Sequence, residues 1–506
     1  EIDDLKYPFM LRWLAAGGVG GASVYPTVTD RVRNVMSMFA IFNYSFENRY
    51  IFNFNIRSDG SNQFGQYERY KFRPAWSTSV RWNLHNEPFI KNMAVSFMDE
   101  LALRLSYGFR GNPPSASPYL TIQNYGQGNT DLSPESELAS FPNANLKWER
   151  TKTLNIGLNH SWLGGRISGA LDYGYSKSLD LLLTRPVSLV NGASSQLYNG
   201  GSKEDHTFEF NIMTQNIKTK DFQWNMNFNI TRVKEKILDG INEDVSFSTV
   251  ESFLNGSIYM KGFPIDGFYS YRFGGLDENG IPTYLGLEDH DAEGNVTITT
   301  QEQALKSALA YSGKREADLT GGLTMGFRYR SLSLNTIFAL SIGSKIRLND
   351  LYQGSNFKLP YPGQNMGSDF VKRWRKPGDE KHTNIPNIIN GSDAESRAYA
   401  QHWSLGLQDQ NIQIIAENAW TMYDNSDHRV VSGNYLKCSN MSFTYDFPIE
   451  KLEKWGISML SASLSTTNLF DIKSKKLKGQ TPIQSGFSET QLSERPTWSL
   501  SLSVSF

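Results

Sequence analysis

The last ten residues of this 506-residue chain, Thr497–Phe506, constrain its fold more than any other segment. Apolar side chains alternate there with threonine and serine, and an extended chain places the two kinds on opposite faces. Such a strand, ending on an aromatic residue, is typical of the closing strand of a transmembrane β-barrel, with lipid outside and a wet interior. Because a soluble sheet strand alternates in the same way, the interpretation depends on how often the pattern recurs.

The alternation recurs along the chain and predicts thirteen strands, most of them near ten residues long. That length exceeds the roughly five or six residues typical of soluble sheets and suits a strand tilted across a membrane. We therefore predict an all-β fold, an antiparallel transmembrane barrel, with Trp224, Phe228, Trp498 and Phe506 facing lipid or its interface. The predicted strands are 36–46, 50–58, 72–84, 101–109, 150–162, 166–176, 207–217, 222–232, 319–330, 332–342, 435–447, 458–468 and 497–506.

Composition argues against several other classes of protein. The net charge of −1 gives no support for a nucleic-acid partner. The chain has no run of eighteen apolar residues, so no transmembrane helix is predicted. Its single cysteine, Cys438, rules out an internal disulfide, and its phase in the alternation predicts a small side chain on the polar face.

Short turns and long polar connections alternate between the predicted strands. Outer-membrane barrels place short turns in the periplasm and long loops outside. Residues 1–35 are therefore expected to be an extracellular loop region, and residues 36–506 the C-terminal part of a barrel. The long extracellular loops are expected at 110–149, 177–206, 233–318, 343–434 and 469–496.

An open sheet cannot sit in lipid, because its edges would leave backbone groups without hydrogen bonds. We expect thirteen of about 22 strands in this chain, which is the size of the plugged transporters. The chain starts with Glu1 and shows no signal peptide, so we read it as part of a longer protein.

Several segments together resemble the SusC-like (RagA-like) TonB-dependent transporters of Bacteroidetes, in the right order along residues 33 to 506. The segments are Arg57–Gly65, Asp99–Gly108, Asn145–Gly157, Asn434–Phe443 and Thr466–Asp471. Each would be weak alone, but together they are specific. The chain is identified as the C-terminal barrel portion of such a transporter.

The resemblance implies TonB-dependent active import of oligosaccharides or peptides across the cell outer membrane. It implies a 22-stranded barrel filled by an N-terminal plug, a SusD-like surface lipoprotein as a lid, and energy from the TonB complex. Plug and TonB box are absent from this chain, so coupling residues cannot be placed on it. The sequence does not say whether the assembly is a dimer of transporter–lid pairs.

Two other classes remain as alternatives. A passive porin or another outer-membrane barrel would show the same strands. A soluble all-β protein would need a convergent catalytic set, and neither a nucleophile elbow nor a Walker loop is present. We therefore predict no enzyme and no cofactor apart from calcium.

Aromatic residues in the long loops are the candidate substrate contacts, because flat rings stack on sugar faces and fill peptide pockets. The alternative is that they brace the loops or contact the lid protein. The candidates are Tyr119, Tyr125, Tyr352, Tyr361, Tyr399 and Trp403.

A calcium site is predicted at Asp289, Asp291 and Glu293, because oxygen ligands stand at alternate positions before a glycine. Thr300 occupies the position where a closing glutamate is expected, so a solvated acidic loop is the alternative. Phe506 is predicted to be the assembly signal, since a terminal aromatic is read by the insertion machinery of outer-membrane proteins generally. Loops 233–318 and 343–434, the longest, are predicted to form most of the lid interface.

Overall fold

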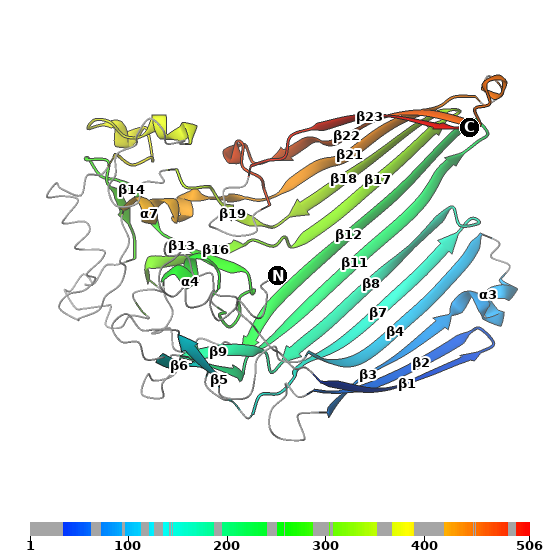
Figure 1. Ribbon diagram of the computed structural model, residues 1–506, viewed down its shortest axis with the longest axis horizontal. Coiled ribbons are helices and arrows are strands. Elements are labelled where there is room, and N and C mark those ends of the chain that lie inside the picture. The colour runs from blue at the N-terminus through cyan, green and yellow to red at the C-terminus, as the bar shows by residue number, and fades with distance from the viewer. Residues whose placement is uncertain are drawn as a thin grey trace, which may run out of the picture.

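One antiparallel sheet of thirteen long strands dominates the computed structural model (Figure 1). Its order follows the chain, and all thirteen strands expected from the sequence are confirmed. The strands are β1 (Val35–Phe46), β2 (Tyr50–Ser61), β3 (Phe72–Asn83), β4 (Met98–Asn112), β7 (Glu149–Trp162), β8 (Ile167–Leu179), β11 (Ser202–Lys218), β12 (Phe222–Asp239), β17 (Leu319–Tyr329), β18 (Leu332–Ile342), β21 (Tyr435–Asp446), β22 (Met459–Lys473) and β23 (Thr497–Ser505).

The structure describes most of the chain, in separate segments. These are residues 34–61, 72–93, 97–112, 121–125, 135–140, 143, 145–186, 195–239, 250–257, 259–286, 303, 307–351, 367–388, 419–448, 450, 452–483 and 492–506. No helix in these segments is long and apolar enough to cross a membrane.

Several strands run further than the alternation predicted, and in β11 and β12 charged pairs continue the ladder where the apolar pattern stops. β11 has 17 residues and β12 has 18. Near their far ends, the Lys203 ammonium contacts Glu235 at 3.1 Å and Asp205 at 3.2 Å. Opposite charges across neighbouring strands stabilise a sheet as apolar pairs do, so the pairing extends into the expected loops 177–206 and 233–318.

The sheet has two unpaired edges within the described residues. β1 pairs only with β2, β23 pairs only with β22, and every residue of β1 is exposed. Figure 1 places these strands at opposite sides of the sheet. Exposed backbone groups of this kind require further strands in lipid.

The position of Cys438 corrects a prediction. The register of β21 shifts between Cys438 and Asn440, so the alternation reverses at that point. Cys438 therefore stands opposite Phe338 on one side and Phe470 on the other, on the apolar face, and it is fully buried. A bulge adds one residue to a strand and reverses its phase, which counting in twos along the sequence does not reveal.

Shorter elements occupy the connections. At one end of the long strands lie the hairpins and helices of the long connections, and at the other end lie the short turns and α3 (Figure 1). The short strands are β5 (Thr121–Tyr125), β6 (Glu135–Ser140), β9 (Leu182–Pro186), β10 (Ser195–Asn199), β13 (Gly267–Tyr271), β14 (Phe273–Leu276), β15 (Pro282–Tyr284), β16 (Leu309–Lys314), β19 (Lys345–Arg347) and β20 (Val430–Ser432). The α-helices are α3 (Pro88–Asn92), α4 (Val250–Leu254) and α7 (Ala419–Asp424), and the 3₁₀ helices are η1 (Leu84–Asn86), η5 (Ser368–Lys372), η6 (Asp379–Lys381), η8 (Asp427–Arg429), η10 (Glu453–Trp455) and η11 (Lys475–Leu477).

Candidate functional site

A row of charged side chains crosses the polar face of the sheet. The pairing register sets Arg81 of β3 beside Arg104 of β4, Arg104 beside Gly157 of β7, and Gly157 beside Asp172 of β8. Asp172 in turn stands beside Glu209 of β11. Residues in register share one face, so two arginines, a glycine and two acids form one lateral line, here called the charged row.

Gly157 has no side chain, and this allows Arg104 and Asp172 to form an ion pair directly above it. The Arg104 Nη2 atom donates to Asp172 Oδ1 at 2.8 Å, although a whole strand separates their own strands. A Cβ atom on residue 157 would overlap both the Asp172 carboxylate and the Arg104 guanidinium. The missing side chain is therefore what lets this ion pair span β7.

A hollow of about 760 Å³ lies over the charged row. Arg81 donates to Glu100 at 2.7 Å at one end of the row. Glu209 at the other end makes no ion pair or hydrogen bond within the described part of the chain. Small and polar residues such as Ser79, Ser106 and Asn155 line the rest, which suits a wet interior.

The opposite face is apolar and carries aromatic pairs close to the short turns. Tyr50 stacks on Trp82, with ring centroids 6.3 Å apart, and Trp224 stacks on Phe327 at 5.8 Å. Trp498 shares this face and is 59% exposed, but it lies at the other end of the sheet, at the start of β23. Aromatic residues at one level of an apolar sheet face form the interfacial belt of a membrane barrel.

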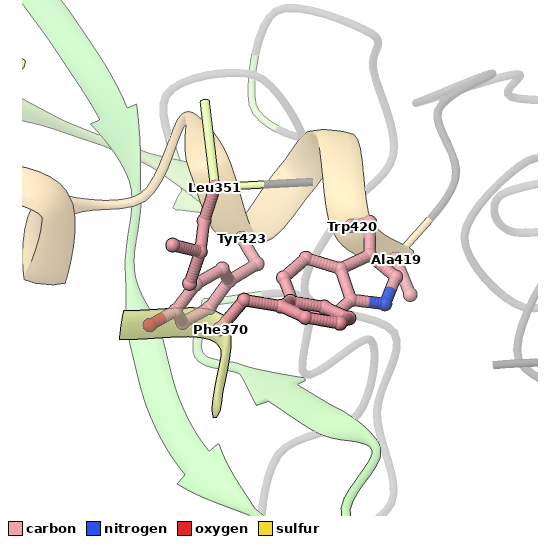
Figure 2. Packing of buried hydrophobic residues seen from close by; sticks show 5 residues of the cluster. All are labelled: Leu351, Phe370, Ala419, Trp420 and Tyr423. Atoms are coloured by element: carbon pink, nitrogen blue, oxygen red, sulfur yellow. The ribbon is translucent and has the colours of Figure 1, made fainter. Parts of the chain in front are cut away.

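A second organised region joins the long connections, here called the loop core. Figure 2 shows Trp420 and Tyr423 of α7 packed with Leu351 and Phe370. These four residues belong to the connection between β18 and β21. Phe273, from the connection between β12 and β17, packs against the same cluster.

Arg347 of β19 binds the two connections together. Its guanidinium donates to the carbonyls of Leu254 and Tyr269 at 3.3 and 2.8 Å, to Ser270 Oγ at 3.0 Å, and to Asn425 Oδ1 at 2.8 Å. The side chain is almost wholly buried. Burial lowers the pKa of Arg347 to about 10, so it stays protonated at neutral pH and its hydrogen bonds are charge-assisted.

Gln480 attaches a third connection, the one between β22 and β23. Its Nε2 donates to the Arg347 carbonyl at 2.9 Å, and its Oε1 accepts from the Asn349 amide at 2.9 Å. The amide side chain therefore pairs with the backbone as a neighbouring strand would. Three connections that are distant in sequence thus share one polar network.

Most of the residues singled out from the sequence lie outside the described segments. Tyr125 is in β5, and Phe506 follows β23 with 89% of its surface exposed. Arg347, Gln480 and the charged row were not predicted from the sequence. Single polar residues in loops carry no periodic signal, and the pairing of residues on neighbouring strands cannot be known before the register is known. The substrate and calcium candidates outside the description are Tyr119, Tyr352, Tyr361, Tyr399, Trp403, Asp289, Asp291 and Glu293.

Thirteen long antiparallel strands with one apolar and one polar, charged face define the wall of a transmembrane β-barrel. A model of the family described as TonB dependent receptor-like, beta-barrel matches residues 9–248. TonB-dependent receptor P3 of Formosa agariphila is 29% identical over 469 residues, which cover 89% of this chain and 42% of the relative. TonB-dependent receptor SusC of Bacteroides thetaiotaomicron is 26% identical over 492 residues, which cover 93% of this chain and 44% of the relative.

Among solved structures, a chain of the RagAB peptide transporter matches with a TM-score of 0.69 at 19% identity, over 94% of this chain and 48% of that chain. Over most of its length the chain is similar to TonB-dependent receptors, and its thirteen strands form a barrel wall of the outer-membrane type. It spans less than half the length of the curated relatives described above. Those relatives are receptors, not enzymes.

Proposed function

We propose that this chain forms part of the wall and the outer loops of a transporter that imports oligosaccharides or peptides by TonB-dependent active transport. The charged, hollowed polar face of a membrane-spanning sheet is the observation that carries the proposal, because a conduit for polar cargo needs such a lining. The relatives named as TonB-dependent receptors support energised uptake, and the RagAB structure supports peptide as one cargo class.

The proposed assembly includes a SusD-like surface lipoprotein over the long connections. The described residues of the β12–β17 and β18–β21 connections pack together in the loop core, which supports a partner that contacts both connections at once. The TonB complex would act through residues outside this chain. A dimer of transporter–lid pairs is compatible with this arrangement.

Energised uptake of labelled maltopentaose and pentaalanine tests the proposal. Cells that carry the complete receptor should accumulate at least one of the two cargoes, and loss of TonB should abolish that uptake. Uptake that persists without TonB would instead identify a passive porin. Mass spectrometry of the detergent-purified receptor should also detect a co-purifying lipoprotein.

Two site assignments stay predictions. Calcium at Asp289, Asp291 and Glu293 predicts that an Asp289→Asn/Asp291→Asn double variant loses calcium binding in titration calorimetry. Single alanine substitutions of the six loop aromatics should weaken cargo binding at those positions where a ring contacts cargo.

A further inference from the structure

The apolar face of the sheet becomes basic near the long connections on four neighbouring strands. β7, β8, β11 and β12 follow one another in the middle of the sheet (Figure 1). Along β7, Ile156 and Leu154 are followed on this face by Lys152, and along β12, Ile230 is followed by Arg232. The apolar alternation therefore ends on a cation, as it would where a barrel strand leaves the hydrocarbon of the membrane.

The pairing register gathers these cations into one patch. Lys152 stands beside Lys177, and Lys177 stands beside Glu204. Glu204 in turn stands beside Lys236. Residues in register share one face, so five basic side chains surround a single carboxylate here. These five residues, here called the basic patch, are Lys152, Lys177, Arg232, Lys234 and Lys236.

The basic patch is not neutralised by the chain itself. None of its five side chains makes an ion pair or a hydrogen bond within the segments that the structure describes, and four of them are exposed. The single carboxylate, Glu204, accepts from the Tyr175 hydroxyl at 3.5 Å. On the polar face of the same strands, by contrast, Lys203 contacts Glu235 at 3.1 Å. Because like charges side by side repel each other, the basic patch needs an anion from outside the chain.

The basic patch is confined to these four strands. In other strands the same face ends, toward the long connections, on apolar side chains. Examples are Met36 of β1, Phe72 of β3, Ile342 of β18 and Ile472 of β22. Lysines that only extend their ammonium groups into the headgroup layer would be expected all around a barrel. A patch on four strands indicates a binding site for a particular anion.

Aromatic side chains border the basic patch on the side of the apolar band. Tyr173 and Phe208 stand beside each other in register and are 39% and 44% exposed. The Tyr173 hydroxyl lies 2.8 Å from His206 Nδ1, and the Tyr175 ring centroid lies 5.0 Å from that of His206. Aromatic rings of this kind mark the boundary between hydrocarbon and headgroups. An amphiphile with an anionic head would therefore meet rings and cations in the right order.

We propose that the basic patch binds the headgroup phosphate of a lipid in the outer leaflet, with the acyl chains against Tyr173 and Phe208. Long connections of outer-membrane barrels lie outside, so this end of the strands belongs to the outer leaflet. Lysine and arginine bind phosphate through charge-assisted hydrogen bonds, and basic clusters at headgroup level bind anionic lipids. The site is separate from cargo transport, because it lies on the face opposite the charged row.

The dimensions of the basic patch suit a phosphate. Three steps between neighbouring strands, at about 4.8 Å each, make the patch about 14 Å wide. A phosphate over its middle can therefore contact cations from two or three strands. Its oxygens accept several hydrogen bonds at once, which a single carboxylate such as Glu204 cannot match for all five cations.

Lipid binding by the complete detergent-purified receptor, measured by thermophoresis, tests the proposed site. The probes are lipid A that carries its phosphates, the same lipid A after enzymatic removal of the phosphates, and inorganic phosphate. The phosphorylated lipid should bind at least tenfold more tightly than the phosphate-free lipid. This difference should shrink as NaCl rises, because salt screens exposed charges.

A triple variant, Lys152→Gln/Lys177→Gln/Lys236→Gln, removes three cations of the basic patch. A basic residue near an anionic membrane surface strengthens binding about fivefold, so the variant should weaken the phosphorylated lipid by about a hundredfold. Its affinity for the phosphate-free lipid should stay native. Because these side chains have no partner in the described part of the chain, the fold loses no ion pair.

The matched control is Lys91→Gln/Lys220→Gln/Lys454→Gln, which changes the net charge by the same amount. These three lysines are exposed, belong to the end of the sheet with the short turns, and make no side-chain ion pair or hydrogen bond within the described residues. The control should bind the phosphorylated lipid as the native receptor does. An equal loss in both triple variants would show a general charge effect and contradict the assignment.

Two further outcomes would overturn the lipid site without any variant. Equal affinity of the native receptor for both forms of lipid A would show that the phosphate is not recognised. Inorganic phosphate bound as tightly as the phosphorylated lipid would identify a site for a free anion instead. TonB-dependent uptake should be unchanged in the triple variant of the basic patch, so a failure of uptake in the native receptor refutes the proposed function alone.

Discussion

Removing the Arg347 guanidinium should loosen three connections at once. The side chain makes four hydrogen bonds in the loop core, and its exposed fraction is 3%. A hydrogen bond from a charged donor contributes about 1.5–3 kcal/mol, and breaking a buried polar network by removing one partner costs about 3–5 kcal/mol. Arg347→Ala should therefore destabilise the loop core by about 4 kcal/mol, because four acceptors lose their donor.

Hydrogen–deuterium exchange of the complete receptor measures this effect. About 4 kcal/mol corresponds to a rise of roughly a thousandfold in local opening. Segments 252–257, 267–271, 419–432 and 477–483 should gain exchange together, whereas the membrane strands should not change. Arg347→Lys should restore about half of the protection, since an ammonium lacks the planar fork.

The pH dependence gives a further check on Arg347. Its pKa in the folded loop core is about 10, below the ordinary 12.5. Between these two values the unfolded chain holds the proton more firmly, so the contribution of this group to stability rises with pH there and is flat near neutrality. Increased exchange confined to the strand around residue 347, or an Arg347-dependent change between pH 6 and 8, would refute the reasoning.

The remaining predictions concern the sheet, its end and one loop. Gly157→Val should destabilise the barrel by about 1 kcal/mol, because the valine side chain displaces the Arg104–Asp172 ion pair. The loss should appear as a lower midpoint of urea unfolding. A similar loss in an Arg104→Gln/Asp172→Asn background, which lacks the ion pair, would contradict this cause. Deleting Phe506 should reduce the amount of folded receptor in outer-membrane fractions, and native levels would refute its role as assembly signal. Burial alone would raise the pKa of Asp180, but its ion pairs with Lys147 and Arg150 outweigh burial, so the pKa is lowered. The contribution of Asp180 to the stability of the fold is therefore complete above about pH 4, and it is lost as the pH falls through the folded pKa. Acid titration should therefore release the β8–β11 connection in exchange experiments, and an Asp180→Asn variant that shows the same acid transition would exclude this carboxylate.

The long strands could be predicted from the sequence because one face of each strand meets lipid and the other meets water. β12, with Trp224 and Phe228 on one face and asparagines on the other, was predicted to start at Phe222, and it does start there. Its end was missed by seven residues, since the expected strand stopped at Arg232 and the ladder runs to Asp239. Beyond the lipid band both faces are wet, so the alternation that marks a strand disappears while the backbone pairing continues.

The loop core shows the opposite case. Tyr423 and Phe273 were unremarkable loop aromatics in the sequence, and 150 positions separate them, yet their rings lie 5.6 Å apart. The same holds for Gln480 and Arg347, whose pairing joins two connections. Contacts between distant irregular segments leave no periodic trace along the chain.

The sequence by itself determined that this protein is a membrane barrel wall, how many long strands it contributes and to which family it is similar, because lipid and water impose a two-residue period on every strand. Only the tertiary structure decided the lateral register. Register places Arg104 opposite Gly157 with Asp172 beyond it, and it reverses the face of Cys438 at a bulge. Packing between the connections, in turn, lets Arg347 form hydrogen bonds with three of them. These features depend on which residues stand side by side in different strands and loops, and that information comes from pairing and packing, not from the order of residues within any one segment.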